Sequence, residues 1–157
     1  MKASSFCLLF IVATILLTTQ AQKPVIGIVS FYSEGWNNHG TKSWNYIAAS
    51  YVKWLKQAGA EVVPIQWDLP YDQIDYLLAR VNGVVFTGGN INITKDGQPT
   101  EIFLAFKHIT QYILKKNQNS NYYPLWGTCQ GFWSIARVLG DNMSVLTRCT
   151  NCWYVNP

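Results

Sequence analysis

The feature that most constrains the fold is a strict alternation of short apolar runs with amphipathic segments between Lys23 and Gly140. The apolar runs are rich in β-branched residues, which is typical of buried strands. The segments between them place apolar residues at helical spacing, and the first one closes at Gly59, as helices often do. The pattern predicts strands at 23–32, 61–67, 83–89 and 122–128, and helices at 43–60, 70–83, 99–117 and 129–140.

This order of elements predicts the fold class. Strands that alternate with helices imply right-handed crossovers and an α/β fold, in which helices cover both faces of a mostly parallel sheet. Ligands of such sheets bind beyond the carboxyl ends of the strands. Two glycine motifs fall at these ends: Gly88-Gly89 after the third predicted strand, and Gly127-x-Cys129-x-Gly131 after the fourth. We therefore expect the functional site at these two turns.

The first part of the chain has the composition of a secretory signal peptide. Lys2 precedes a long apolar run, and small residues lead up to a cleavage position near Ala21. The run is shorter than the roughly 20 residues of a stable transmembrane helix, so we expect residues 1–21 to be removed and no membrane anchor to remain. Two glycosylation sequons, which begin at Asn92 and Asn142, fit the same route.

Secretion affects how the cysteines are interpreted. Removal of the signal peptide leaves Cys129, Cys149 and Cys152, an odd number in an oxidising compartment. A local disulfide between Cys149 and Cys152, or pairing of both with partners elsewhere, would leave Cys129 as the free thiol. Zinc or redox chemistry at this C-x-x-C is the weaker alternative, because no second pair and no histidine accompany it.

Charge and motifs exclude several classes of partner. The formal net charge is +4, but the basic residues are scattered and Lys115-Lys116 is the only adjacent pair. No stripe of the kind that neutralises nucleic-acid phosphates is present. The two glycine-rich motifs that bind phosphate groups, G-x-x-x-x-G-K-[ST] and G-x-G-x-x-G, do not occur. We expect a small-molecule substrate, no nucleic acid, no metal and no organic cofactor.

The second glycine motif predicts a nucleophile. A nucleophile on a sharp strand-to-helix turn needs small residues two positions before and after it, which Gly127 and Gly131 provide for Cys129. The turn also places the thiol at a helix N-terminus, where the dipole and the free N–H groups favour the thiolate. The alternative is an inert buried cysteine in a tight turn.

Acyl transfer also needs backbone N–H groups aimed at the developing oxyanion. The residue after the nucleophile usually supplies one of them, and here that residue is Gln130. The turn on the neighbouring strand end offers the other, from Gly88 or Gly89. A plain strand-ending turn is the alternative for this pair.

The base that should activate the cysteine is harder to find. A cysteine hydrolase needs a histidine to take and return protons. No histidine follows Cys129, and Asp141 is the only acidic residue there. His39 lies in the loop after the first predicted strand, which opens on the site. His108 lies inside a predicted helix, where a structural role is expected.

Three segments resemble successive motifs of the secreted γ-glutamyl hydrolases (folate γ-glutamyl hydrolase), members of the class I glutamine-amidotransferase-like superfamily. They are YIAASYVKWLKQAGAEVVPI, NGVVFTGGNINI and YYPLWGTCQGF, within a resemblance that runs from about residue 23 to residue 148. The resemblance implies that Cys129 attacks the γ-amide of glutamate and forms a thioester, with Gln130 and Gly89 as the oxyanion hole. It also implies folate poly-γ-glutamates or γ-glutamyl peptides as substrates, in lysosomes, vacuoles or outside the cell. The family's glycine turn usually begins with proline, where this chain has Thr87.

The same resemblance places the family's histidine and its acidic partner in a His-x-Glu pair far downstream, and none follows Cys129 here. We therefore expect residues 22–157 to be the N-terminal portion of such a domain, incomplete at its C-terminus. The alternative is a truncated, non-catalytic secreted relative that acts as a binding or interaction module. In either case we expect residues 22–157 alone to be poorly soluble or to form a homodimer through exposed surfaces.

Overall fold

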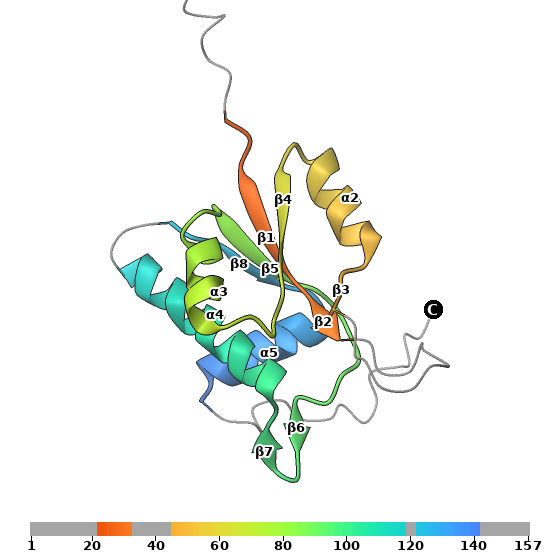
Figure 1. Ribbon diagram of the computed structural model, residues 1–157, viewed down its shortest axis with the longest axis vertical. Coiled ribbons are helices and arrows are strands. Elements are labelled where there is room, and N and C mark those ends of the chain that lie inside the picture. Colours follow the sequence, from red (N-terminus) through yellow and green to blue (C-terminus); the bar gives the residue numbers. More distant parts are fainter. Residues whose placement is uncertain (1–21, 33–44, 119–121, 142–157) are drawn as a thin grey trace, which may run out of the picture.

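The computed structural model describes residues 22–32, 45–118 and 122–141. Its centre is a four-stranded, fully parallel sheet with the strand order β4-β1-β5-β8 (Figure 1). The predicted α/β class and the mostly parallel sheet are thereby confirmed. The strands are β1 (Val25–Val29), β4 (Glu61–Ile65), β5 (Gly83–Phe86) and β8 (Leu125–Gly127).

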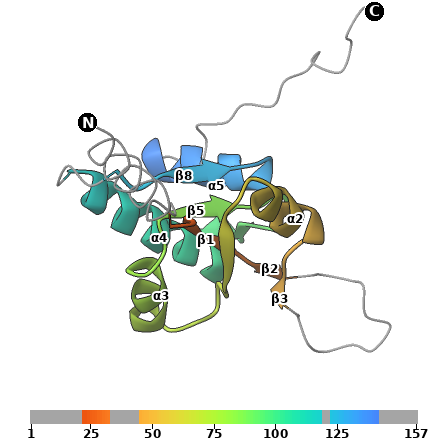
Figure 2. The same cartoon turned by 90° about the horizontal axis from the view of Figure 1, so that it is seen from above.

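Helices cover both faces of this sheet, as predicted. Figure 2 shows α2 on one side of the strands and α3 and α4 on the other. The last described helix, α5, packs against α4 and β8. The helices are α2 (Ala49–Gln57), α3 (Tyr71–Leu78), α4 (Glu101–Gln118) and α5 (Gln130–Leu139).

Successive side chains of each strand point to opposite faces of the sheet. Because helices cover both faces, the strands are nearly continuous apolar runs in the sequence. Val84 and Phe86 join the larger buried cluster, under α3 and α4, whereas Val85 joins a smaller one under α2. Fully burying one such side chain stabilises the fold by roughly 1.5–3 kcal/mol. On the face under α2 the sheet is covered less completely. Trp54 and Trp126 are 46% and 58% exposed there, and their ring centroids lie 6.2 Å apart.

The register of the sheet brings the strand ends to one level. Val29 of β1 lies beside Phe86 of β5, and Phe86 lies beside Gly127 of β8. The turns that follow β5 and β8 therefore leave the sheet side by side. These are the two turns where the sequence predicts the functional site.

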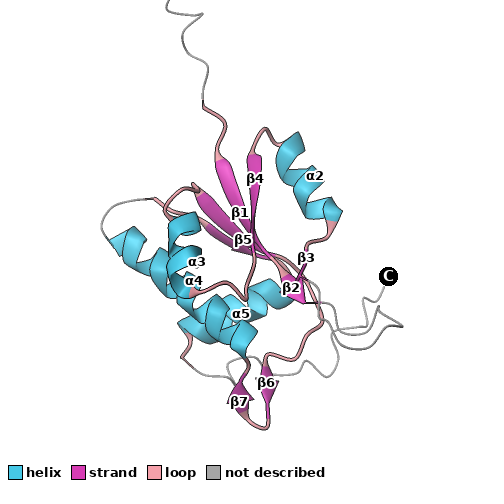
Figure 3. Ribbon diagram, viewed as in Figure 1, coloured by secondary structure: helices cyan, strands magenta, loops and turns pink. Residues whose placement is uncertain are grey.

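The structure corrects the helix predicted at 43–60. Asn45–Tyr46 form the short strand β3, which pairs with β2 (Phe31–Tyr32), and the helix begins only at Ala49 (Figure 3). The side chain of Asn45 accepts a hydrogen bond from Ser30 Oγ at 2.9 Å and donates one to Asp68 at 2.8 Å. These contacts, between segments far apart in the sequence, hold the residue in extended backbone where its local pattern favours a helix.

A second small ladder, β6 (Thr94–Lys95) with β7 (Gln98–Pro99), was also not predicted. Asp96 and Gly97 at its tip have φ values of +50° and +75°, as a tight hairpin turn requires. Asp-Gly is a known signal for such turns, so this hairpin was readable from the sequence. As a result, the long helix begins at Glu101 rather than at residue 99.

Candidate active site

Cys129 occupies a sharp turn between β8 and α5, with φ 51° and ψ −112°. This is the backbone of the first central residue of a type II′ turn, a position that glycine dominates. A side chain in such a region is held under strain of about 1–3 kcal/mol, and strain of this kind clusters at functional sites. The thiol is unbonded and exposed. The turn therefore presents the sulfur of Cys129 to solvent at the carboxyl end of the sheet.

Gly127 and Gly131 allow this turn to form. A Cβ added to Gly127 would lie 2.6 Å from the backbone N of Phe132, and one added to Gly131 would lie 2.7 Å from Cβ of Phe86. Side-chain carbons are essentially never found that close to other heavy atoms. Helix α5 can thus start directly against β5 only because both positions lack a side chain.

The turn after β5 lies against the cysteine. A Cβ added to Gly88 would be 3.3 Å from Cβ of Cys129 and 3.1 Å from the hydroxyl oxygen of Tyr51 on α2. The N–H of Gly88 donates to that hydroxyl at 2.9 Å. The N–H of Gly89, by contrast, has no acceptor within the described ranges. Of the two predicted oxyanion donors in this turn, only Gly89 is therefore available.

Gln130 contributes in two ways, of which the sequence indicated only one. Its backbone N–H is the first of α5, so the helix offers it no carbonyl, and no other acceptor lies among the residues described. Its side chain is buried: Oε1 accepts the N–H of Ile91 at 2.9 Å, and Nε2 donates to the carbonyl of Ile91. This pairing joins the segment after β5 to the start of α5.

The structure places neither His108 nor Asp141 at this turn. His108 Nε2 lies 2.7 Å from Asp75 Oδ1, and its ring stacks on Tyr71 at 4.2 Å, so its contacts join α3 and α4. Asp141 follows the opposite end of α5 from Cys129. His39 lies outside the described residues, as do the predicted signal peptide, Asn142, Cys149 and Cys152.

Other predicted features can be placed only in part. Asn92 and Thr94, the ends of the first sequon, are exposed. In the described part of the chain, no three His, Cys, Asp or Glu side chains gather as metal ligands would. No helix of that part combines the length and apolar character needed to cross a membrane.

Comparisons with known proteins extend this description. Residues 24–147 match the family model for Peptidase C26. The chain is 37% identical over 127 residues to gamma-glutamyl hydrolase of Bos taurus, which covers 80% of this chain and 38% of that protein. It is 38% identical over 128 residues to gamma-glutamyl hydrolase of Rattus norvegicus, a match that covers 81% of this chain and 38% of that protein. It is 33% identical over 147 residues to gamma-glutamyl hydrolase B of Dictyostelium discoideum, a match that covers 92% of this chain and 41% of that protein. The chain spans about two fifths of the length of these curated relatives.

Proposed function

Since the chain belongs to the peptidase C26 family, we propose that it carries the nucleophile and the oxyanion hole of a γ-glutamyl hydrolase. The observation that carries the proposal is the strained, exposed Cys129 turn, beside which the N–H groups of Gly89 and Gln130 have no acceptor among the described residues. The names of the relatives supply the reaction class.

In the proposed reaction the Cys129 thiolate attacks the carbonyl carbon of a γ-glutamyl amide. A C–S bond forms, and the carbonyl electron pair moves to oxygen, which accepts hydrogen bonds from the N–H groups of Gln130 and Gly89. The intermediate then collapses, the C–N bond breaks, and the amine leaves with a proton. Water hydrolyses the resulting thioester, which releases the γ-carboxylate and restores the thiol.

The two turns supply electrostatic stabilisation rather than proton transfer. Preorganised donors are effective because they need no reorientation when the negative charge develops, and loss of one such donor typically slows catalysis about 10²- to 10³-fold. No described histidine contacts Cys129. The proposal therefore assigns the proton transfers to a group outside the described residues.

The substrate class and the location are further parts of this proposal. We propose poly-γ-glutamyl folates or γ-glutamyl peptides as substrates, in keeping with the motif resemblance and with the names of the relatives. The apolar run that follows Lys2 supports secretion or delivery to a lysosome or vacuole.

Single-turnover mass spectrometry tests the proposal. The chain is mixed with a γ-glutamyl peptide and quenched, and we expect a glutamyl adduct on Cys129 that is absent from Cys129→Ala. Circular dichroism establishes that both proteins are folded. If the folded wild-type chain binds the peptide but is acylated neither by it nor by glutamate γ-(4-nitrophenyl) ester, whose leaving group needs no proton, the hydrolase proposal is wrong and a non-catalytic binding module is favoured.

A further inference from the structure

We propose that Tyr51 is a positioning residue, which fixes the oxyanion hole by holding the N–H of Gly88. The proposal rests on the hydrolase function proposed above, and it adds a residue on α2 to a site otherwise built from β5, β8 and α5. Its role is to orient the Gly88-Gly89 turn, so that the N–H of Gly89 is the one that meets the substrate.

The first observation is the hydrogen bond itself. The N–H of Gly88 donates to the Tyr51 hydroxyl at 2.9 Å, across 37 residues of sequence. Glycine has no side chain to restrict its backbone, so a Gly-Gly turn has many accessible conformations. A bond that engages one of its two N–H groups removes much of that freedom. It also removes Gly88 as a competing oxyanion donor.

The second observation is that the other end of the same turn is fixed independently. The carboxamide of Gln130 pairs with both the N–H and the carbonyl of Ile91, two residues after Gly89. A Cβ added to Gly89 would lie 3.1 Å from Gln130 Oε1 and 3.0 Å from the ring of Phe31. The turn is thus held between α2 and α5, and loss of the Tyr51 contact would release one side only.

The third observation is how Tyr51 itself is supported. Its side chain is partly buried and packs against the cluster of Ile28, Leu55 and Val85 beneath α2. Packing of this kind restricts the ring, so its hydroxyl presents an acceptor at a defined place. The hydroxyl and Cβ of Cys129 both lie close to the position that a Cβ at Gly88 would take, at 3.1 Å and 3.3 Å.

The test compares Tyr51→Phe with Tyr123→Phe in the full chain. Both changes remove one phenolic hydroxyl and keep the ring. The Tyr123 hydroxyl donates to the carbonyl of Leu78 at 2.8 Å and has no part in the site. Two reactions of Cys129 are measured in each protein. Iodoacetamide alkylates the thiolate without forming an oxyanion, whereas glutamate γ-(4-nitrophenyl) ester acylates it through one.

In the acylation a C–S bond forms, the ester C–O bond breaks, and 4-nitrophenolate leaves with the electron pair, so no general acid is required. We expect Tyr51→Phe to lower the saturating acylation rate about 10-fold and to leave the alkylation rate within about twofold of wild type. The half-saturating ester concentration should change little, since the hydroxyl acts on the turn. Tyr123→Phe should leave both rates unchanged.

Other outcomes separate this inference from the proposed function. If wild type is acylated and Tyr51→Phe matches it, the positioning role is wrong and the hydrolase function stands. If Tyr51→Phe chiefly raises the half-saturating ester concentration, the hydroxyl contacts the substrate and does not position the turn. If folded wild type is alkylated but not acylated, the proposed function fails and the positioning role fails with it.

Discussion

The backbone at Cys129 predicts that Cys129→Gly is more stable than Cys129→Ala, although both changes remove the thiol. With φ 51° and ψ −112°, the residue occupies a conformation that suits glycine and strains every other side chain. Strain of this kind costs on the order of 1–3 kcal/mol. Alanine keeps this strain, because it keeps Cβ, whereas glycine relieves it.

The size of the effect follows from two opposing terms. Glycine loses more conformational freedom on folding than alanine does, which normally costs about 0.5–1 kcal/mol. Relief of about 1–3 kcal/mol of strain outweighs this loss. We therefore expect the free energy of unfolding of Cys129→Gly to exceed that of Cys129→Ala by about 1 kcal/mol, within a range of roughly 0–2.5 kcal/mol.

Urea denaturation of the two variants measures this difference directly. The matched control is the pair formed by wild type and Ala136→Gly, an alanine-to-glycine change inside the same helix, α5. Glycine at such a position should destabilise the protein by about 1 kcal/mol. Glycine should therefore raise the free energy of unfolding relative to alanine at position 129 and lower it at position 136. If glycine is the less stable choice at both positions, the strain argument is refuted.

Three further predictions concern the supports of this turn and the core. Gly131→Ala should lower the free energy of unfolding by about 2 kcal/mol in a urea titration, because its Cβ would lie 2.7 Å from Cβ of Phe86, and overpacking of this kind costs about 1–3 kcal/mol. Gln130→Met should lower the ratio of acylation to alkylation at Cys129 several-fold, since it frees both peptide groups of Ile91; an unchanged ratio would contradict this. Burial raises the pKa of the Tyr123 phenol above its ordinary value of 10.0, so above about pH 10 the unfolded chain ionises first and stability falls as pH rises. Tyr123→Phe should make that alkaline loss less steep in unfolding curves recorded from pH 8 to about pH 11, and an unchanged slope would show that other groups cause it.

Local sequence patterns predicted the sheet and the two turns because both depend on near neighbours in the chain. β-branched runs identify strands that are buried on both faces, and Gly127 and Gly131 mark the two positions of the turn that have no room for a side chain. The motif alone was enough to predict Gln130 as a backbone N–H donor, because Gln130 follows Cys129. What its carboxamide does was not predictable in this way, because its partner, Ile91, is 39 residues distant.

The same limit explains the other differences. The sequence pattern around Asn45 favours a helix, but its contacts with Ser30 and Asp68 hold it in a strand. The bond from Gly88 to Tyr51 joins segments 37 residues apart, and nothing in the local pattern of Tyr51 distinguishes it from an ordinary residue of an amphipathic helix. Contacts of this kind arise from the assembled fold and become visible only with it.

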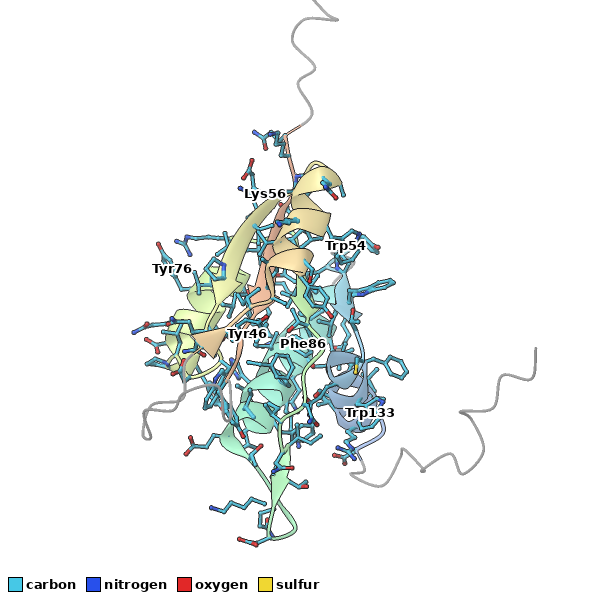
Figure 4. All side chains as sticks on the ribbon, turned by 90° about the vertical axis from the view of Figure 1, so that its right-hand side faces the viewer. Tyr46, Trp54, Lys56, Tyr76, Phe86 and Trp133 are labelled. Atoms are coloured by element: carbon cyan, nitrogen blue, oxygen red, sulfur yellow. The ribbon has the colours of Figure 1, made fainter. Side chains whose placement is uncertain are left out.

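The buried core and the strained turn meet at Phe86, which explains how the fold can maintain an unfavourable backbone at Cys129. Phe86, which is labelled in Figure 4, is fully buried. Its ring stacks on that of Phe106, with the ring centroids 4.6 Å apart. Its carbonyl accepts the N–H of Thr128 at 3.0 Å, and its backbone lies directly under Gly131. Strain persists in a native structure only where the surroundings determine the geometry more strongly than the local preference does. Phe86 contacts the residues on both sides of Cys129, namely Thr128 and Gly131. The energy gained by packing Phe86 and its neighbours therefore keeps the exposed thiol in place.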